Sequence, residues 1–336
     1  MIVCKFGGSA TATKQALENV LSLKSDDRNV WVFSAIGKSN SSNTKLTDLL
    51  IKYTSSKSNK TKIKKQIKAK LLMLKKYTNC KQDTNSFVDE ICSVFDTNKN
   101  KFWLISRGEY ITAKIMAEYL NIKFLPAEKI IFFKNNELNL EKIEKTIKKY
   151  IIEYKNIVIP GFYGLNECDS NFALSHTEYN STVDRIKLFS RGGSDFSASI
   201  IAKCLGANIY ENWTDVEGIF ETNPQIAKLN RIERMSYSDL DIMSNFDAKV
   251  IHKDCAKLLN GTDTKLIVKS ILAPQKSGTI VSTICQPCNY CVFKSVGNRT
   301  KAMIGLKNGN KISISAQKDS NNEILKLYKK LKSNSI

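Results

Sequence analysis

The sequence predicts an α/β protein, a three-layer sandwich in which helices cover both faces of a mainly parallel sheet, with a small α+β appendage at its C-terminal end. Three observations support this. Short apolar runs alternate with helical stretches over most of the 336 residues. Several of these runs end at glycine-rich turns. The last segment instead has short alternating strands before one amphipathic helix.

The first part of the chain supplies the opening strands and helices. Apolar runs that continue without alternation predict strands buried on both faces, because a parallel sheet is covered on each side. Strands are expected at 1–6, Asn29–Ala35 and Phe102–Ser106, and helices near Lys14–Leu23 and Glu109–Leu120.

The pattern continues in the second part of the chain. A short buried strand is expected at Ile157–Pro160, running into Gly161-Phe162-Tyr163-Gly164. Ser194–Leu205 is expected to be helical, Asn208–Trp213 a strand, and Ser236–Leu259 mostly helical. The alternation of strands and helices indicates βαβ units.

The C-terminal end has a different character. Three alternating strands are expected, followed by an amphipathic helix: Asn289–Val296, Ala302–Leu306 and Lys311–Ala316, then Asn321–Leu331. We therefore expect a large domain at 1–282 and an appendage at 283–336. The appendage is too short to bury a stable hydrophobic core on its own.

The chain is strongly basic, with 52 Lys and Arg against 32 Asp and Glu, a net charge of +20. A basic surface attracts polyanions such as nucleic acid. The alternative is lysine spread over solvated helix faces. Lys57–Lys76 shows this pattern, since Ile63, Ile67, Leu71 and Leu74 recur at helical spacing and no aromatic is available to stack on bases. We favour the solvated faces and expect no nucleic-acid partner.

No apolar run approaches the roughly 20 residues that cross a bilayer, and the first residues lack a signal-peptide pattern. A cytoplasmic protein is expected, so the nine cysteines are expected to be thiols. Cys285, Cys288 and Cys291 form the one tight cluster. A zinc site needs four ligands, and no second pair completes the set, so a structural or incidental role is preferred to a metal or redox site.

The first chemical motif is Lys5-Phe6-Gly7-Gly8-Ser9, between a strand and a helix. Glycines allow the backbone to approach an anion, and the helix N-terminus and the lysine add positive charge. Lysine precedes the glycines, so this is not a Walker A motif. The alternative interpretation is a tight turn.

The second motif, Ser190–Asp195, opens a helix and combines more elements of an anion site. Arg191 offers a planar fork for a carboxylate or phosphate, and Gly192 and Gly193 expose backbone donors. Ser194 is a candidate helix cap. Asp195 suits either a magnesium ion or the holding of Lys5. A capped loop is the plainer alternative.

The third motif is Trp213–Phe220, a strand end followed by a turn. Ligands bind beyond the carboxyl ends of strands in open α/β sheets, which places Thr214 and Asp215 where a nucleotide would lie. A simple Asp- and Gly-containing turn is the alternative.

The linked set of motifs resembles aspartokinases, members of the amino-acid kinase superfamily, over residues 1 to about 282. The segments match in order and approximate spacing. They are Lys5–Ser9, Ser106-Arg107-Gly108-Glu109, Pro160-Gly161-Phe162, Arg191–Asp195, Trp213-Thr214-Asp215 and Ala248-Lys249-Val250-Ile251-His252.

The resemblance implies the amino-acid kinase fold, ATP and Mg²⁺ as cofactors, and phosphorylation of L-aspartate at its side chain. Lys5 would meet the transferring phosphoryl group and Asp195 would organise the centre. The amino acid would be bound by Thr44, Glu109, Phe162, Arg191 and Ser194, with Arg191 on the α-carboxylate and Glu109 on the α-amino group. The nucleotide would contact Lys5, Gly7, Gly8, Gly192, Gly193, Thr214, Asp215, Phe220 and Lys249.

The chemistry agrees with this set of side chains. A carboxylate nucleophile is ionised at pH 7, so no general base is needed. Neutralising the shared negative charge is the main requirement, and lysine, Mg²⁺ and backbone N–H groups supply it. His252 is therefore expected to be structural, within a helix. The metal ligands stay open.

Several positions depart from the family pattern. Ser190 stands where glycine is usual, Gln225 follows Asn223-Pro224 where arginine is usual, and Asp247 replaces a glycine. The segment 165–189, with Cys168 and His176, is long, and the loop 37–44 before Thr44 is extended. Weaker binding of ATP is a hypothesis that follows from these changes.

The C-terminal segment is shorter than the two ACT modules typical of the family. We therefore expect loss of lysine or threonine feedback and a degenerate ACT-like appendage that serves dimer contact; a homodimer is implied by the resemblance. Two other functions stay open: a kinase of the same fold for another small amino acid, and a non-catalytic amino-acid or nucleotide sensor.

Overall fold

The protein is seen in a computed structural model that describes residues 1–39, 42–167, 182–190, 192–246 and 251–334. Its centre is an eight-stranded sheet in the order β10-β12-β11-β9-β1-β2-β6-β3. Neighbouring strands are parallel except for the pair β11 and β12. The mainly parallel central sheet is therefore confirmed. The strands are β1 (Ile2–Phe6), β2 (Arg28–Phe33), β3 (Lys123–Phe124), β6 (Ile157–Pro160), β9 (Ile209–Thr214), β10 (Arg234–Ser236), β11 (Lys265–Ser270) and β12 (Thr279–Ser282).

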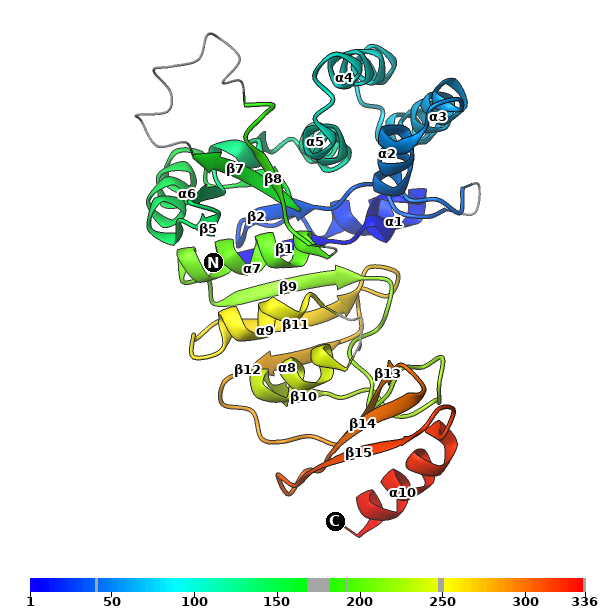
Figure 1. Cartoon of the computed structure of the whole chain (residues 1–336). Coiled ribbons are helices and arrows are strands. Elements are labelled where there is room, and N and C mark those ends of the chain that lie inside the picture. Colours follow the sequence, from blue (N-terminus) through cyan, green and yellow to red (C-terminus); the bar gives the residue numbers. More distant parts are fainter. Residues whose placement is uncertain (40–41, 168–181, 191, 247–250, 335–336) are drawn as a thin grey trace.

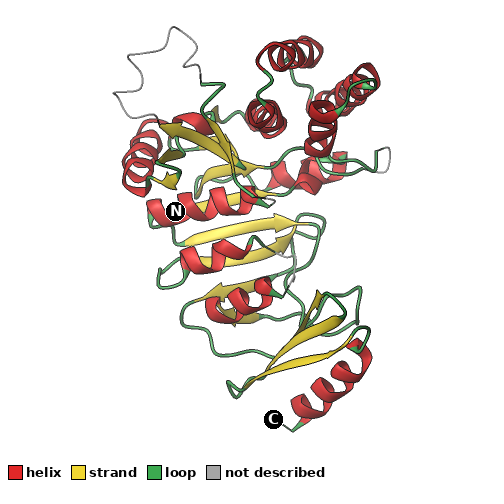
Figure 2. Cartoon of the chain, in the orientation of Figure 1, coloured by secondary structure: helices red, strands yellow, loops and turns green. Residues whose placement is uncertain are grey.

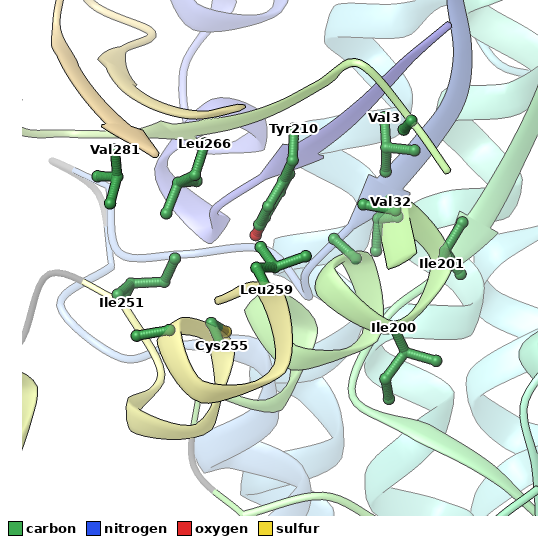
Figure 3. Packing of buried hydrophobic residues seen from close by; sticks show 14 of the residues in the cluster. Val3, Val32, Ile200, Ile201, Tyr210, Ile251, Cys255, Leu259, Leu266 and Val281 are labelled. Atoms are coloured by element: carbon green, nitrogen blue, oxygen red, sulfur yellow. The ribbon is translucent and has the colours of Figure 1, made fainter. Parts of the chain in front are cut away.

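Two apolar cores lie on opposite faces of this sheet, because successive side chains of a strand point to opposite sides. Val3 of β1 belongs to one core, and Cys4 and Phe6 of the same strand belong to the other. The first core includes residues of α6–α9, and the second includes residues of α1–α5. Figure 3 shows the first, with Tyr210 of the sheet pointing toward the helices. Helices on both faces confirm the predicted layers.

The helices of these two layers are α1 (Lys14–Ser22), α2 (Leu46–Ser55), α3 (Lys60–Thr78), α4 (Thr84–Asn98), α5 (Lys101–Leu120), α6 (Leu140–Tyr154), α7 (Gly193–Leu205), α8 (Tyr237–Asn245) and α9 (Lys253–Leu259), with short 3₁₀ turns η1 (Gly8–Thr11) and η2 (Ala127–Lys129). A second sheet has the order β5-β4-β7-β8. Its strands are β4 (Phe132–Lys134), β5 (Glu137–Leu138), β7 (Tyr163–Glu167) and β8 (Ile186–Leu188).

The C-terminal unit is a three-stranded antiparallel sheet with one helix: β13 (Tyr290–Val296), β14 (Arg299–Gly305), β15 (Lys311–Gln317) and α10 (Asn321–Ser333). It lies at the end of the molecule opposite α2–α5 (Figure 1). In Figure 2, which has the same orientation, α10 is red and the strands β13–β15 are yellow. Tyr328, Ile324 and Leu325 of α10 pack on the buried side chains of β13 and β14. The predicted α+β appendage is confirmed as a fold, and the boundary at 282/283 falls between β12 and β13.

The strand expected at Phe102–Ser106 is wrong. These residues form the beginning of α5, whose first turn is capped by the Asn100 side chain accepting from Trp103 N–H at 3.0 Å. Helix α5 is packed by other elements around most of its circumference, so its apolar residues show no clear helical period. Gly108 permits this packing, since a Cβ there would lie 3.0 Å from Leu50 Cδ1.

The basic helix predicted from Lys57–Lys76 is α3, and its apolar stripe is buried as expected. Most of its lysines lie toward solvent, with Lys70 the buried exception. Among the described helices, none combines the length and apolar character needed to cross a membrane. The eight cysteines in the described part of the chain are free thiols.

Candidate active site

The centre of the site is an ion pair between the first strand and the first turn of α7. Lys5 Nζ lies 2.6 Å from Asp195 Oδ1, and both residues are 8% exposed. Asn212 of β9 joins them, accepting from Lys5 Nζ at 3.4 Å and donating to Asp195 Oδ1 at 3.3 Å. Because β1 and β9 are adjacent and parallel, Lys5 and Asn212 are register partners. The lysine therefore has a fixed position at the sheet.

Asp195 is held from a second direction as well. Its Oδ2 accepts from the backbone N–H of His252 at 3.2 Å. Of the two roles that the sequence suggests for Asp195, the structure shows the holding of Lys5. Within the described ranges, no three His, Cys, Asp or Glu side chains gather as a set that could hold a metal ion.

The first glycine pair closes the end of β1 against its neighbours. Gly7 N–H donates to the carbonyl of Trp213 at 2.9 Å, and Gly37 N–H donates to the carbonyl of Gly8 at 2.8 Å. A Cβ on Gly8 would lie 2.7 Å from the Ala35 carbonyl oxygen, so a side chain has no room there. The turn beside Lys5 is thus built from backbone, as an anion site requires, although Gly7 N–H is already bonded.

The second glycine pair leads into α7. Gly192 has φ +87°, in the left-handed region that favours glycine, and α7 begins at Gly193. Gly161 packs against the same turn, since a Cβ there would lie 2.7 Å from Ser194 Cβ. The buried Ser194 and Asp195 therefore occupy the first turn of a 13-residue helix. In this turn the N–H of Gly193, which was expected to be an exposed donor, donates to the Ser190 carbonyl at 2.9 Å, and the N–H of Asp195 donates to the Gly192 carbonyl at 3.0 Å. Arg191 lies outside the described residues.

Phe162 has an unusual backbone for a residue with a side chain, with φ +78°. Its N–H donates to Ser197 Oγ of α7 at 2.9 Å, and its carbonyl accepts from Phe189 N–H at 2.9 Å. These two bonds tie the turn after β6 to α7 and to the chain entering the second glycine pair. A conformation that costs energy and is fixed from both sides is a frequent feature of functional sites.

Glu109 is a carboxylate inside α5 that is 4% exposed. Its Oε1 accepts from Thr47 Oγ1 at 3.2 Å, whereas Oε2 has no hydrogen-bond partner in the described part of the chain. Burial raises its pKa to about 8, and hydrogen bonds from the backbone and from Thr47 and the charge of Arg107 offset only part of that effect. The unpartnered oxygen is suited to a cationic ligand group.

Thr44 lies in a different environment from Glu109. It lines an open hollow of about 360 Å³ with Lys38, Asn43, Asp48, Ile51 and Lys52. The threonine that contacts Glu109 is Thr47, in the first turn of α2. Because the loop before α2 is extended, the threonine beside Glu109 lies three residues later in the chain than the predicted Thr44.

The residues expected at the nucleotide lie beyond the end of β9. Thr214 is its last residue, and Thr214 Oγ1 donates to the exposed Asp215 at 3.1 Å. Phe220 forms an isolated bridge with Arg231 in the following loop. Lys249 and Asp247 lie outside the described residues, as do Cys168 and His176.

His252 is placed differently from the prediction. It is the N-cap of α9 and not a residue within the helix. Its Nδ1 accepts from Asp254 N–H at 3.3 Å, and its Nε2 lies within hydrogen-bond distance of Ser190 Oγ, at 2.6 Å. Ser190, the departure from the family glycine, is thereby connected to the segment that also holds Asp195.

Sequence reasoning missed Asn212, Thr47 and Ser197. Asn212 gave one available signal, because a polar residue in an otherwise apolar central strand requires a partner. Thr47 and Ser197 gave none, since a threonine or serine early in a helix is common and its side-chain partner depends on tertiary packing.

Comparison with known proteins places this geometry in context. Residues 1–270 match the amino acid kinase family. Aspartokinase 3 of Bacillus subtilis is 26% identical over 302 residues, which cover 84% of this chain and 63% of that protein. The aspartokinase of Chlamydia pneumoniae is 24% identical over 305 residues, covering 86% of this chain and 64% of that protein. This chain thus spans less than two thirds of these relatives' length.

Two solved structures are also similar. The aspartate kinase of Clostridium acetobutylicum has a TM-score of 0.75 and 25% identity, with 98% of this chain and 82% of that chain covered. E. coli aspartokinase III in complex with aspartate and ADP has a TM-score of 0.74 and 18% identity, with 90% and 69% covered. The second likeness concerns the fold.

Proposed function

Since this chain belongs to the amino acid kinase family, we propose that it transfers the γ-phosphoryl group of ATP to the side-chain carboxylate of L-aspartate, giving 4-phospho-L-aspartate and ADP. The observation that carries the proposal is the buried Lys5–Asp195 pair, 2.6 Å apart, set between two glycine turns. The aspartokinase names of the relatives support aspartate as the substrate.

The transfer needs alignment and charge neutralisation more than proton chemistry. The substrate carboxylate is ionised at neutral pH, so its oxygen attacks the γ-phosphorus while the bond to the bridging oxygen of ADP breaks. Lys5 is the cation at this point. Asp195 and Asn212 hold its Nζ, so that the positive charge is in place before negative charge shifts in the transition state.

Recognition of the amino acid is assigned to Glu109, Arg191 and Ser194. The unpartnered Oε2 of Glu109 would receive the α-ammonium group. Arg191 would grip the α-carboxylate through its planar fork. Ser194, in the first turn of α7, would add a hydrogen bond. Phe162 would line the same pocket.

Mg²⁺ is proposed as the companion of ATP. In kinases this ion is held by substrate phosphates, waters and one or two carboxylates, so a full cage of protein ligands is not needed. Asp195 fits such a contact, because its Oδ2 accepts one hydrogen bond, from His252 N–H, and keeps a second lone pair. When bound, the ion would neutralise charge on the phosphates.

The test is hydroxamate trapping with purified protein, ATP, Mg²⁺ and L-aspartate. We expect an acyl-phosphate signal that is lost in Lys5→Ala and retained in the matched control Lys76→Ala, whose side chain is exposed on α3. Turnover with another small amino acid but not aspartate would replace the substrate. Absence of turnover with every acid would favour the sensor and overturn the enzyme proposal.

The biological role follows as a finer proposal. The product would enter the aspartate-family pathway toward lysine or diaminopimelate, threonine and methionine, in the cytoplasm, and the chain would act as a homodimer. We also propose that these 336 residues lack lysine and threonine feedback. Inhibition by millimolar lysine, or a monomeric mass by light scattering, would contradict the respective part.

A further inference from the structure

The loop between β9 and β10 is shared by the two units of the molecule. On one side it is fixed to the central sheet: Ile219 N–H donates to Thr279 Oγ1 of β12 at 2.8 Å. The loop then doubles back on itself, because Ile232 N–H donates to the Ile219 carbonyl at 2.8 Å and Glu221 N–H to the Asn230 carbonyl at 3.0 Å. Its two arms therefore form a narrow loop that extends away from the sheet over residues 219–232.

On the other side, the loop 219–232 packs against the core of the C-terminal unit. Ile226, Ala227 and Leu229 pack on the apolar cluster formed by α10 and the strands β13–β15. The Glu221 carbonyl also accepts from Cys291 N–H of β13 at 2.6 Å. The C-terminal unit is thus connected to the loop through both backbone and side chains.

Glu221 provides the polar part of this connection. The residue is 6% exposed, and its carboxylate faces α10. Lys332 Nζ contacts Oε1 at 2.7 Å and Oε2 at 2.8 Å, while Tyr328 donates its hydroxyl to Oε2 at 2.9 Å. Burial and the nearby Glu221 carboxylate raise the pKa of Tyr328, so its hydroxyl stays protonated and available as a donor.

We propose that α10 positions the loop 219–232 through Tyr328, Lys332 and Glu221, and that the C-terminal unit thereby sets the affinity of the site for adenine nucleotide. The inference rests on the proposed function in one respect, the placing of nucleotide beside Phe220. Glu221 is a positioning residue, because it acts through its neighbour Phe220 and touches no reacting atom.

The physical reason is the cost of an unpaired buried charge. With Lys332 removed, the Glu221 carboxylate keeps one side-chain donor, Tyr328, and its burial becomes unfavourable. The loop relieves this by moving Glu221 toward water, and Phe220 moves with it. Loss of one contact at the end of α10 is therefore transmitted to the edge of the predicted nucleotide site.

The first experiment compares Lys332→Met with Lys329→Met, which removes an equal charge from an exposed position of the same helix. Binding of a fluorescent ADP analogue is measured, together with KM for ATP, KM for aspartate and kcat. We expect the Kd for the analogue and KM for ATP to rise about three- to tenfold in Lys332→Met. KM for aspartate and kcat stay within about twofold, Lys332→Arg restores binding, and Lys329→Met behaves as wild type.

The second experiment measures hydrogen exchange of the loop amides in the same variants, with Tyr328→Phe as an independent disruption. Faster exchange across 219–232 in Lys332→Met, with exchange in β1 and β2 unchanged, supports positioning by α10. Unchanged loop exchange overturns the inference. Faster exchange with unchanged nucleotide affinity overturns the link to the site. Wild type that binds no adenine nucleotide would remove the proposed function, while loop exchange would still decide whether α10 holds the loop.

Discussion

The Glu109 side chain is buried, and one oxygen of its carboxylate, Oε2, has no hydrogen-bond partner within the described residues. A carboxyl group in this state holds a proton near neutral pH, as its pKa of about 8 indicates. An arriving ammonium ion changes that balance, since a nearby opposite charge favours the carboxylate. Binding of the amino acid is therefore expected to release a proton from Glu109.

This release predicts a pH dependence of KM for aspartate. Below pH 8 the free protein must lose the Glu109 proton before the ammonium group is paired, so KM is expected to fall as pH rises from 6.5 to 8, by at most about tenfold per pH unit. Steady-state kinetics across this range provide the measurement. Glu109→Gln should have a higher KM with a flat profile, and an equal slope in both proteins would show that another group titrates.

The same residue predicts how stability varies with pH. The folded-state pKa of Glu109 is raised from 4.5, so its contribution is fully present below pH 4.5 and is lost as pH rises through about 8. Glu109→Gln is expected to be more stable than wild type at pH 8, by a margin on the order of a few kcal/mol, and to show little gain at pH 4.5. Urea unfolding of the ligand-free proteins at both values is the measurement.

At the scale of elements, the strands β1, β2 and β9 are joined by a polar network beneath the site. Arg28 of β2 reaches across β1 and forms a two-pronged ion pair with Glu211 of β9, at 2.9 and 3.0 Å. Cys4 and Trp213 donate to the same carboxylate. Burial opposes ionisation of Glu211, but the hydrogen bonds and charge of Arg28 outweigh it and lower the pKa.

Arg28→Met is therefore expected to destabilise the protein by about 3 kcal/mol at pH 7, because it leaves Glu211 buried without its cation. Since the pKa of Glu211 is lowered by the pair, the loss should shrink as pH falls through that pKa. Lys14→Met on the exposed face of α1 serves as the control. Equal unfolding midpoints in urea for Arg28→Met and wild type would contradict the expectation.

The elements β2, β6 and α5 differ in how well the sequence predicts them. Strands such as β2 and β6 were predictable because a parallel strand buried on both faces leaves a short continuous apolar run. The second half of helix α5 was predicted correctly, but its first half was taken for a strand, because a helix packed on most sides leaves a similar apolar run. At the site, Lys5, Gly192 and Asp195 carry local signals in their glycine turns. Asn212 and Thr47 act through contacts with distant parts of the chain, which a linear pattern does not contain.

At the scale of the whole molecule, two ion pairs join the units. In each pair, a buried carboxylate of the larger unit meets a lysine of the C-terminal unit. Glu221 meets Lys332, and Asp239, which is 1% exposed, meets Lys311 of β15 at 3.1 Å. Tyr290 and Val292 of β13 belong to the apolar core of the central sheet. In the other direction, Ile226, Ala227 and Leu229 of the larger unit pack on the core of the C-terminal unit, so each unit contributes side chains to the core of the other.

We accordingly expect a single cooperative unfolding transition. Pulsed hydrogen exchange in urea should give the same midpoint for peptides from β14 and from β9, within about 0.2 M, as in a two-state transition. A midpoint for β14 well below that for β9 would show that the C-terminal unit unfolds separately.

The position of β1 in the sheet has a consequence for synthesis on the ribosome. The first strand of the chain lies in the interior of the sheet, with β2 on one side and β9 on the other. Its partner Ile209 is made more than 200 residues after Ile2. The nascent chain can pair β1 with β2 early, but the other edge of β1 stays open until β9 has left the exit tunnel. During that interval Lys5 lacks its register partner Asn212, and the growing chain offers an exposed strand edge that molecular chaperones are suited to cover.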